Sequence, residues 1–119
     1  MKKRLLFLLA CVTASVAAAA DVSGKWQVHT SISGNESDLV CTFTQKEDAL
    51  TGTCAGDRGK FEISGKVSGA KVSWSYKSEY NGTPLTVKHD GVSDTAGIKG
   101  TVEVPEFGVS GEFAATPSK

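Results

Sequence analysis

The sequence predicts an all-β protein, an eight-stranded antiparallel up-and-down barrel around one hydrophobic core. Apolar and polar side chains alternate with a two-residue period after residue 20, where the 3.6-residue periodicity of helices is absent. Short turn sequences separate the alternating stretches. Glycines recur on the inner face, where they let a strand bend sharply. These three observations favour a barrel over its alternative, a sandwich.

Eight strands are expected, in the order in which the alternation appears. They cover residues 23–32, 38–45, 49–55, 60–67, 71–78, 84–91, 96–104 and 107–115. The separators are rich in glycine, asparagine, aspartate and proline, which tight turns prefer. Asn81-Gly82 is the strongest of these signals, because a type I′ hairpin requires positive φ at both central residues.

A recurring pattern, apolar-x-Gly-x-apolar, accounts for the expected curvature. It reads VSGKW at 22–26, LTGTC at 50–54, ISGKV at 63–67, IKGTV at 98–102 and VSGEF at 109–113. The glycine shares a strand face with both flanking apolar residues, because side chains i and i+2 point to the same side. The bare backbone there leaves room for a neighbouring aromatic ring. Five copies predict a tightly coiled sheet.

The alternation divides the strands into an apolar inner face and a polar outer face. The inner set is Trp26, Val28, Leu39, Phe43, Leu50, Phe61, Ile63, Val67, Val72, Trp74, Tyr76, Leu85, Val87, Ile98, Val102, Phe107, Val109 and Phe113. The opposite face is rich in lysine, serine, threonine and glutamate. The inner set therefore predicts one continuous core.

The start of the chain has the organisation of a secretory signal peptide. A basic MKKR sequence precedes a long apolar run, and small residues ending at Ala20 fit a cleavage site. Removal of residues 1–20 would leave residues 21–119 as a single barrel domain, secreted or periplasmic. A lipoprotein signal at Cys11 is one alternative. An uncleaved membrane span is another, but spanning needs ~20 apolar residues.

The charge balance restricts the possible partners. Three of the thirteen basic residues lie in this leader and none of the thirteen acidic residues does, so the exported domain is mildly acidic. Binding to nucleic acid or to an anionic lipid surface requires a basic patch. We therefore expect no nucleic-acid partner and no membrane span.

Cys41 and Cys54 are the cysteines that remain after residue 20, and we expect them to form a disulfide. If the intervening turn is centred on Glu47 and Asp48, the two cysteines face each other across a hairpin. Directly opposed residues lie ~4.5–5.5 Å apart in a non-hydrogen-bonded pair. This separation is within the range of a disulfide.

Two alternatives for this cysteine pair are a zinc site and a redox switch. A zinc site needs two more ligands, and the chain offers only His29 and His89, without zinc-binding spacing. A redox switch needs an accessible thiolate, whereas an inward pair is shielded. No metal site and no cofactor are predicted.

Signals for catalysis are weak. His89 continues the inward run of Leu85 and Val87, and it would act as a general base or be a structural histidine at the edge of the core. His29 is expected on the surface. Neither a nucleophile elbow nor a carboxylate pair accompanies them. The sequence predicts no catalytic residue and no enzymatic activity.

Trp74, Tyr76, Tyr80 and His89 are the predicted ligand-binding residues. Aromatic side chains near a barrel mouth stack on sugars or heteroaromatic rings, and their polar tips fix the orientation of the ligand. A barrel of ~8 strands is only just wide enough for its own side chains or one small ligand. For Trp74 a filled core is therefore the favoured interpretation, and ligand binding is the alternative.

The order GKW, LTGTC, ISGKV, VSWSYKSEYN and VSGEF resembles avidin and streptavidin, which are secreted eight-stranded barrels. The resemblance implies that Trp74 is a biotin-stacking tryptophan and that His89 lies near another aromatic position. Cys54, however, stands where the family's motif leads to a biotin-contacting tyrosine. The Asn-x-x-Gly-Ser contact group is also missing after the first tryptophan. These departures count against biotin binding.

A second resemblance is to the small periplasmic metalloprotease inhibitors, on the basis of a G-x-W opening and a single disulfide. The inhibitory element of that family is the free N-terminal stretch before the barrel. Here only Asp21 and Val22 would precede SGKW after cleavage, so most of that stretch is missing.

The sequence as a whole predicts a secreted, non-catalytic barrel that acts as a binding or interaction module. Its partner would be a small molecule or a protein. The alternatives are an inhibitor-like or purely structural barrel, and a small-ligand carrier with a pocket near Trp74, Tyr76 and His89.

Overall fold

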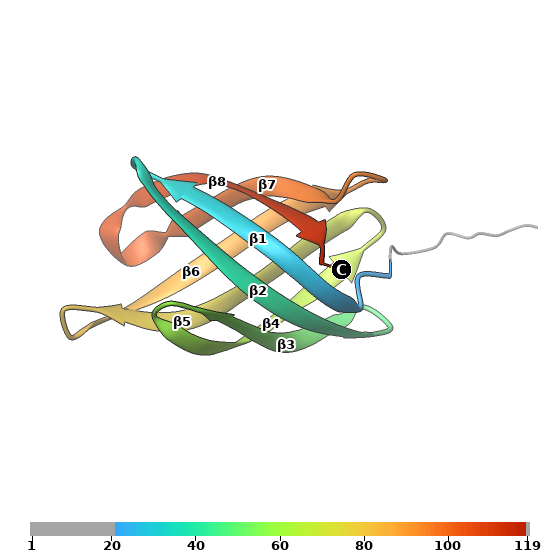
Figure 1. The fold of residues 1–119 in the computed structure, drawn as a ribbon, viewed down its shortest axis with the longest axis horizontal. Helices are drawn as coiled ribbons and strands as arrows, with labels where there is room; N and C mark the ends of the chain where they lie inside the picture. The colour runs from blue at the N-terminus through green and yellow to red at the C-terminus, as the bar shows by residue number, and fades with distance from the viewer. Residues whose placement is uncertain (1–20, 119) are drawn as a thin grey trace, which may run out of the picture.

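A computed structural model describes residues 21–118, which form a closed barrel of eight antiparallel strands (Figure 1). The strands are β1 (Gly24–Ile32), β2 (Asn35–Lys46), β3 (Ala49–Gly56), β4 (Gly59–Ser68), β5 (Lys71–Tyr80), β6 (Thr83–Ser93), β7 (Ile98–Val104) and β8 (Val109–Pro117). Each strand pairs with the next, and β8 pairs with β1. This confirms the predicted fold class. The expected leader, residues 1–20, lies outside the described residues.

The second strand begins earlier than the alternation predicts. The expected strand bounds leave a five-residue connection at 33–37, but the turn contains only Ser33 and Gly34, with φ of 50° and 82°. The expected turn at Asn81 and Gly82 has φ of 53° and 81°. Positive φ at both central residues is the type I′ signature, which matches the twist of the flanking strands. A two-residue turn therefore lets β2 start at Asn35.

The connections alternate between the two ends of the barrel. The β1–β2, β3–β4 and β5–β6 turns share one end, named the mouth here, with the short 3₁₀ turn η2 (Pro105–Phe107) between β7 and β8. The remaining turns share the other end, named the closed pole, where the C-terminus is marked in Figure 1. Ser118 donates its backbone N–H to the carbonyl oxygen of Lys25 there, at 2.9 Å. Both ends of the described chain thus lie at the closed pole.

The core contains most of the predicted inner face. Its buried apolar residues are Val22, Val28, Leu39, Cys41, Phe43, Leu50, Cys54, Ile63, Val67, Val72, Trp74, Leu85, Val87, Ile98, Val102, Val104, Phe113 and Ala115. The prediction for Phe107 is wrong, because this side chain is 45% exposed. Pro105 starts η2 directly after Val104 and breaks the strand alternation, so Phe107 no longer follows it inward.

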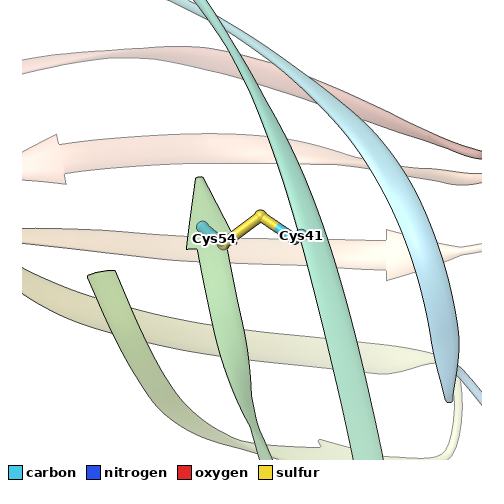
Figure 2. Close-up of a disulfide and its surroundings, with 2 residues drawn as sticks. All are labelled: Cys41 and Cys54. Carbon is cyan, nitrogen blue, oxygen red and sulfur yellow. A yellow bond between two sulfur atoms is a disulfide. The ribbon is translucent and has the colours of Figure 1, made fainter. Parts of the chain in front are cut away.

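The cysteine pair confirms the predicted hairpin register. Cys41 on β2 faces Cys54 on β3, and the two are joined by a disulfide (Figure 2). Phe43 faces Gly52 two pairs further along. Both cysteines are fully buried in the core. A disulfide is consistent with an extracellular or periplasmic protein.

The residues before β1 plug the closed pole. Val22 is buried, and its backbone N–H donates to Oε1 of Gln45 at 2.9 Å. Its carbonyl oxygen accepts a hydrogen bond from Nε1 of Trp26, also at 2.9 Å. The backbone N–H of Gln45 donates to Oγ of Ser23 at 2.9 Å. These contacts fill one end of the barrel with the protein's own residues.

Candidate functional site

The mouth of the barrel contains an open cavity of about 560 Å³. Its apolar wall consists of Ile32, Leu85, Val104 and Val109, from four different strands. Leu85 and Val104 are buried, so they form a preformed apolar base. Small-ligand pockets typically have volumes of ~300–1,000 Å³ and mostly apolar walls. The mouth therefore has the size and the lining of a small-molecule site.

Two aromatic side chains form part of the rim of this cavity. Tyr80, at the end of β5, and Phe107, in η2, pack edge to face with ring centroids 6.1 Å apart. They are 53% and 45% exposed, respectively. Exposed aromatic pairs at a cavity are typical of ligand or partner contacts.

A hydrogen-bonded carboxylate holds η2, and with it Phe107, against β6. Glu106 accepts hydrogen bonds from the backbone N–H of Thr86 at 2.9 Å and from its hydroxyl at 2.8 Å. The backbone hydrogen bond from Thr86 is the main reason that the pKa of Glu106 lies below its usual value. Lys77 donates to the same hydroxyl oxygen at 2.8 Å. The aromatic rim is therefore fixed to the barrel wall.

Below the mouth the barrel is filled by an aromatic layer. Trp74 and His89 stack with ring centroids 4.6 Å apart and planes 11° apart. Phe113 packs edge-on against both rings, at 5.1 Å and 5.0 Å, and Phe43 lies 5.0 Å from Trp74. Both Trp74 and His89 are 2% exposed. The interior around Trp74 is therefore filled, which is the arrangement that the sequence favours for this residue.

Burial also determines the protonation of His89. The apolar surroundings disfavour the imidazolium form and lower the pKa of His89 from 6.5 to about 4, against a smaller opposing effect of the Trp74 backbone. Nδ1 of His89 and Nε1 of Trp74 are buried without a hydrogen-bond partner within residues 21–118. At neutral pH His89 is thus an uncharged ring in the core.

The four predicted ligand-binding residues occupy two different levels of the barrel. Tyr80 lines the cavity. Trp74 and His89 belong to the aromatic layer below, and Tyr76 lies beside them, 6.0 Å from His89 and stacked on Phe61 at 4.7 Å. Burial raises the pKa of Tyr76 above its usual value. The structure therefore brings Trp74, Tyr76 and His89 together and sets Tyr80 apart from them; their role in binding stays a prediction.

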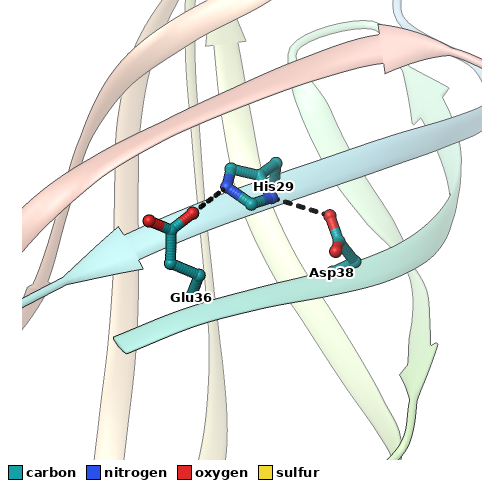
Figure 3. Close-up of polar contacts among 3 residues, drawn as sticks. All are labelled: His29, Glu36 and Asp38. Carbon is teal, nitrogen blue, oxygen red and sulfur yellow. Dashed lines mark hydrogen bonds and ion pairs between the residues drawn. The ribbon is translucent and has the colours of Figure 1, made fainter. Parts of the chain in front are cut away.

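A polar cluster lies on the outer surface next to the mouth (Figure 3). Nδ1 of His29 is 2.8 Å from Oδ1 of Asp38, and its Nε2 is 2.6 Å from Oε1 of Glu36. Hydrogen bonds to these two carboxylates raise the pKa of His29 above 6.5, and the bond to Asp38 makes the largest contribution. The outward position of His29 was predicted, but its partners were not. The signal was available, because the hairpin register pairs His29 directly with Asp38.

Within residues 21–118, no group of three or more His, Cys, Asp or Glu side chains is arranged to hold a metal ion. In the same part of the chain, no helix has the length and apolar character needed to cross a membrane.

Most residues of the mouth, including Arg58, Val104 and the exposed Phe107, are not among the predicted ligand-binding residues. The predicted set consists mainly of aromatic side chains along the inner face, whereas the mouth is formed at the strand ends. A usable signal existed, because alternate turns of an up-and-down barrel share one end. The inward residues next to the first, third, fifth and seventh turns could therefore have been grouped from the sequence.

Related proteins of known function would give independent information about what this cavity binds. The chain matches no protein-family model, no curated protein and no solved structure. The geometry of the mouth is therefore the basis for assigning a function.

Proposed function

We propose that the protein is an exported, non-catalytic binding module that holds a small molecule in the mouth of its barrel. The observation that carries this proposal is the preformed cavity of about 560 Å³ with apolar walls and an aromatic rim. Export is supported by the signal-like leader and by the buried disulfide.

The contrast between the two ends of the barrel supports a binding role for the mouth. At the closed pole, Val22 and Trp26 fill the interior and satisfy their own polar groups. At the mouth, Tyr80 and Phe107 leave about half of their surface in water. Exposing large aromatic side chains has a hydrophobic cost, which a bound ligand would offset.

The environments of the two histidines support a non-catalytic role. His89 is buried in the aromatic layer, so it has no access to a substrate in solution. Both ring nitrogens of His29 are occupied by carboxylates, and neither contacts a hydroxyl or thiol group in the described part of the chain. A general base needs a reacting group within hydrogen-bonding reach.

The position of the N-terminal segment favours small-molecule binding over protease inhibition. An inhibitory N-terminal stretch has to be free to enter a protease. Here Val22 is 2% exposed and is hydrogen-bonded to Gln45. Residues 21–23 are therefore part of the barrel plug.

The proposal is tested by filling the cavity. Val109→Phe places a ring in the mouth, whereas Val92→Phe adds the same ring at a 54% exposed site on β6 and is the matched control. Native mass spectrometry of the exported protein should show a copurifying small molecule on the wild type and on Val92→Phe, and a reduced amount on Val109→Phe. Equal adducts on all three proteins, or none on any, would contradict a mouth site.

A further inference from the structure

The charged residues of the mouth indicate which class of ligand it takes. Glu36 and Arg58 are the two charged side chains that line the cavity. The carboxylate of Glu36 is engaged, because its Oε1 is 2.6 Å from Nε2 of His29. His29 in turn holds Asp38 with its other nitrogen. Glu36 therefore has a hydrogen-bond partner on the outer surface, and that partner is shared with Asp38.

Arg58 has no such partner. It lies in the turn between β3 and β4, and the ion pairs within residues 21–118 all belong to His29. Asp57 precedes Arg58 in the turn, but no ion pair joins the two residues. A guanidinium carries five N–H donors and stays charged at any physiological pH. The mouth therefore presents, at its edge, one cationic side chain that forms no ion pair within residues 21–118.

The rest of the cavity complements an apolar group. Leu85, Val104 and Val109 form apolar wall, and Tyr80 and Phe107 offer ring faces and edges at the rim. Serine and asparagine side chains from the start of β2 add neutral hydrogen-bonding groups. An apolar cup with a cation at its edge is complementary to a molecule with one apolar end and one anionic end.

We propose that the ligand is an amphipathic organic anion, a carboxylate attached to an aromatic or alkyl body. Its apolar body occupies the cup beneath Tyr80 and Phe107, and its carboxylate pairs with Arg58. This inference rests on the proposed function, because it specifies the ligand of the same mouth. The planar, forked guanidinium of Arg58 favours a carboxylate, which can accept two parallel hydrogen bonds.

The test uses isothermal titration calorimetry to compare two probes, 4-phenylbutyrate and 4-phenylbutan-1-ol. Both carry a phenyl group on a four-carbon chain, and they differ in ending in a carboxylate or a hydroxyl group. The wild type should bind the carboxylate about tenfold more tightly than the alcohol, as expected for a charge-assisted hydrogen bond. Arg58→Gln should remove this preference by weakening carboxylate binding about tenfold and leaving alcohol binding unchanged. Lys60→Gln removes the same charge from an exposed β4 residue outside the cavity lining, so it should keep the preference.

The outcomes distinguish an error in the ligand class from an error in the proposed function. Equal affinity for the two probes, or an unchanged carboxylate affinity in Arg58→Gln, overturns the inference and leaves the mouth site standing. Failure of both probes to bind also overturns the inference. The proposed function fails only if native mass spectrometry of the wild type and Val109→Phe shows no difference in bound small molecules. Thermal unfolding of each variant verifies that the barrel remains folded.

Discussion

The two histidines of the chain lie within one small barrel and have opposite acid–base properties. His89 is enclosed by Trp74 and Phe113, and burial lowers its pKa to about 4. His29 lies on the outer surface between Asp38 and Glu36, which raise its pKa above 6.5. The inward or outward position of each ring follows from strand alternation. The direction of each pKa shift follows from what surrounds the ring, which alternation alone does not specify.

Acid should destabilise the barrel through His89. Its pKa is 6.5 when unfolded and about 4 when folded, so the unfolded chain binds more protons between these values and stability falls as the pH falls from 6.5 towards 4. The loss amounts to about 3 kcal/mol at most, at 1.36 kcal/mol per pKa unit. His89→Phe keeps an aromatic ring and should lose less stability over this range. Urea denaturation of both proteins at pH 7 and pH 4.5 measures the difference, and parallel pH profiles would contradict it.

The His29 cluster should have the opposite pH dependence. Because the folded-state pKa of His29 is raised, its contribution is complete below pH 6.5 and is lost as the pH rises through the folded-state value. Proton NMR titration of the His29 ring should give a midpoint above 6.5. Asp38→Asn and Glu36→Gln should each lower this midpoint, whereas Glu62→Gln, on the exposed face of β4, should not. A midpoint unaffected by Asp38→Asn would refute the assignment.

The strands show why glycine recurs on the inner face. Gly65 on β4 is paired with Trp74 on β5, and Gly52 on β3 is paired with Phe43 on β2. A Cβ atom at Gly65 would overlap the carbonyl oxygen of Ser73 and lie 2.6 Å from Cα of Trp74. The bare backbone thus allows neighbouring strands to approach closely where a large ring occupies the core. At both pairs, the atoms that an added Cβ would meet belong to the backbone of the paired strand.

Gly65→Ala should therefore destabilise the barrel. The added methyl group has to displace backbone atoms of β5, and overpacking of this kind typically costs about 1–3 kcal/mol. Ser64→Ala, at the adjacent exposed position, is the matched control and should change the free energy of unfolding by less than about 0.5 kcal/mol. Chemical denaturation of the three proteins measures both effects. Equal stability of Gly65→Ala and the wild type would mean that the strands can separate without cost.

The β2–β3 hairpin should depend on its disulfide. Cys41 and Cys54 are separated by 13 positions, and a cross-link over such a loop contributes about 3 kcal/mol in the chain-entropy model. The double variant Cys41→Ala and Cys54→Ala should unfold at a correspondingly lower urea concentration and retain its β-sheet circular dichroism. Alkylation of the wild type without reductant should leave its intact mass unchanged. Modification of both cysteines would show that the bond is absent.

Much of the architecture of the whole molecule could be predicted from the sequence. Alternation located the strands, and the turn between Cys41 and Cys54 fixed the register of one hairpin. The prediction was wrong at two places where turn residues interrupt the two-residue alternation of the strands. The turn at Ser33 is shorter than its five-residue polar sequence indicates, and Pro105 turns Phe107 out of the core.

The mouth was harder to predict, because it is a property of the closed barrel. Arg58 lies in a turn, and its sequence neighbourhood resembles any exposed polar loop. It becomes a site residue only when the β3–β4 and β7–β8 connections meet at one end, which brings Phe107 and Tyr80 to the same cavity. Trp74 and Tyr76 carried the strongest aromatic signal in the sequence, but inward aromatic side chains fill a narrow barrel before they can form a pocket.

The location of both ends of the described chain, residues 21 and 118, at the closed pole has a practical consequence. Ser118 is hydrogen-bonded to Lys25 at that pole, and Val22 is anchored there by Gln45. The cavity opens at the opposite end. A linker attached directly before Asp21 or directly after Ser118 would hold the barrel with its opening directed away from the support. The scaffold is therefore suited to oriented immobilisation and to fusion at both ends, with access to the cavity preserved.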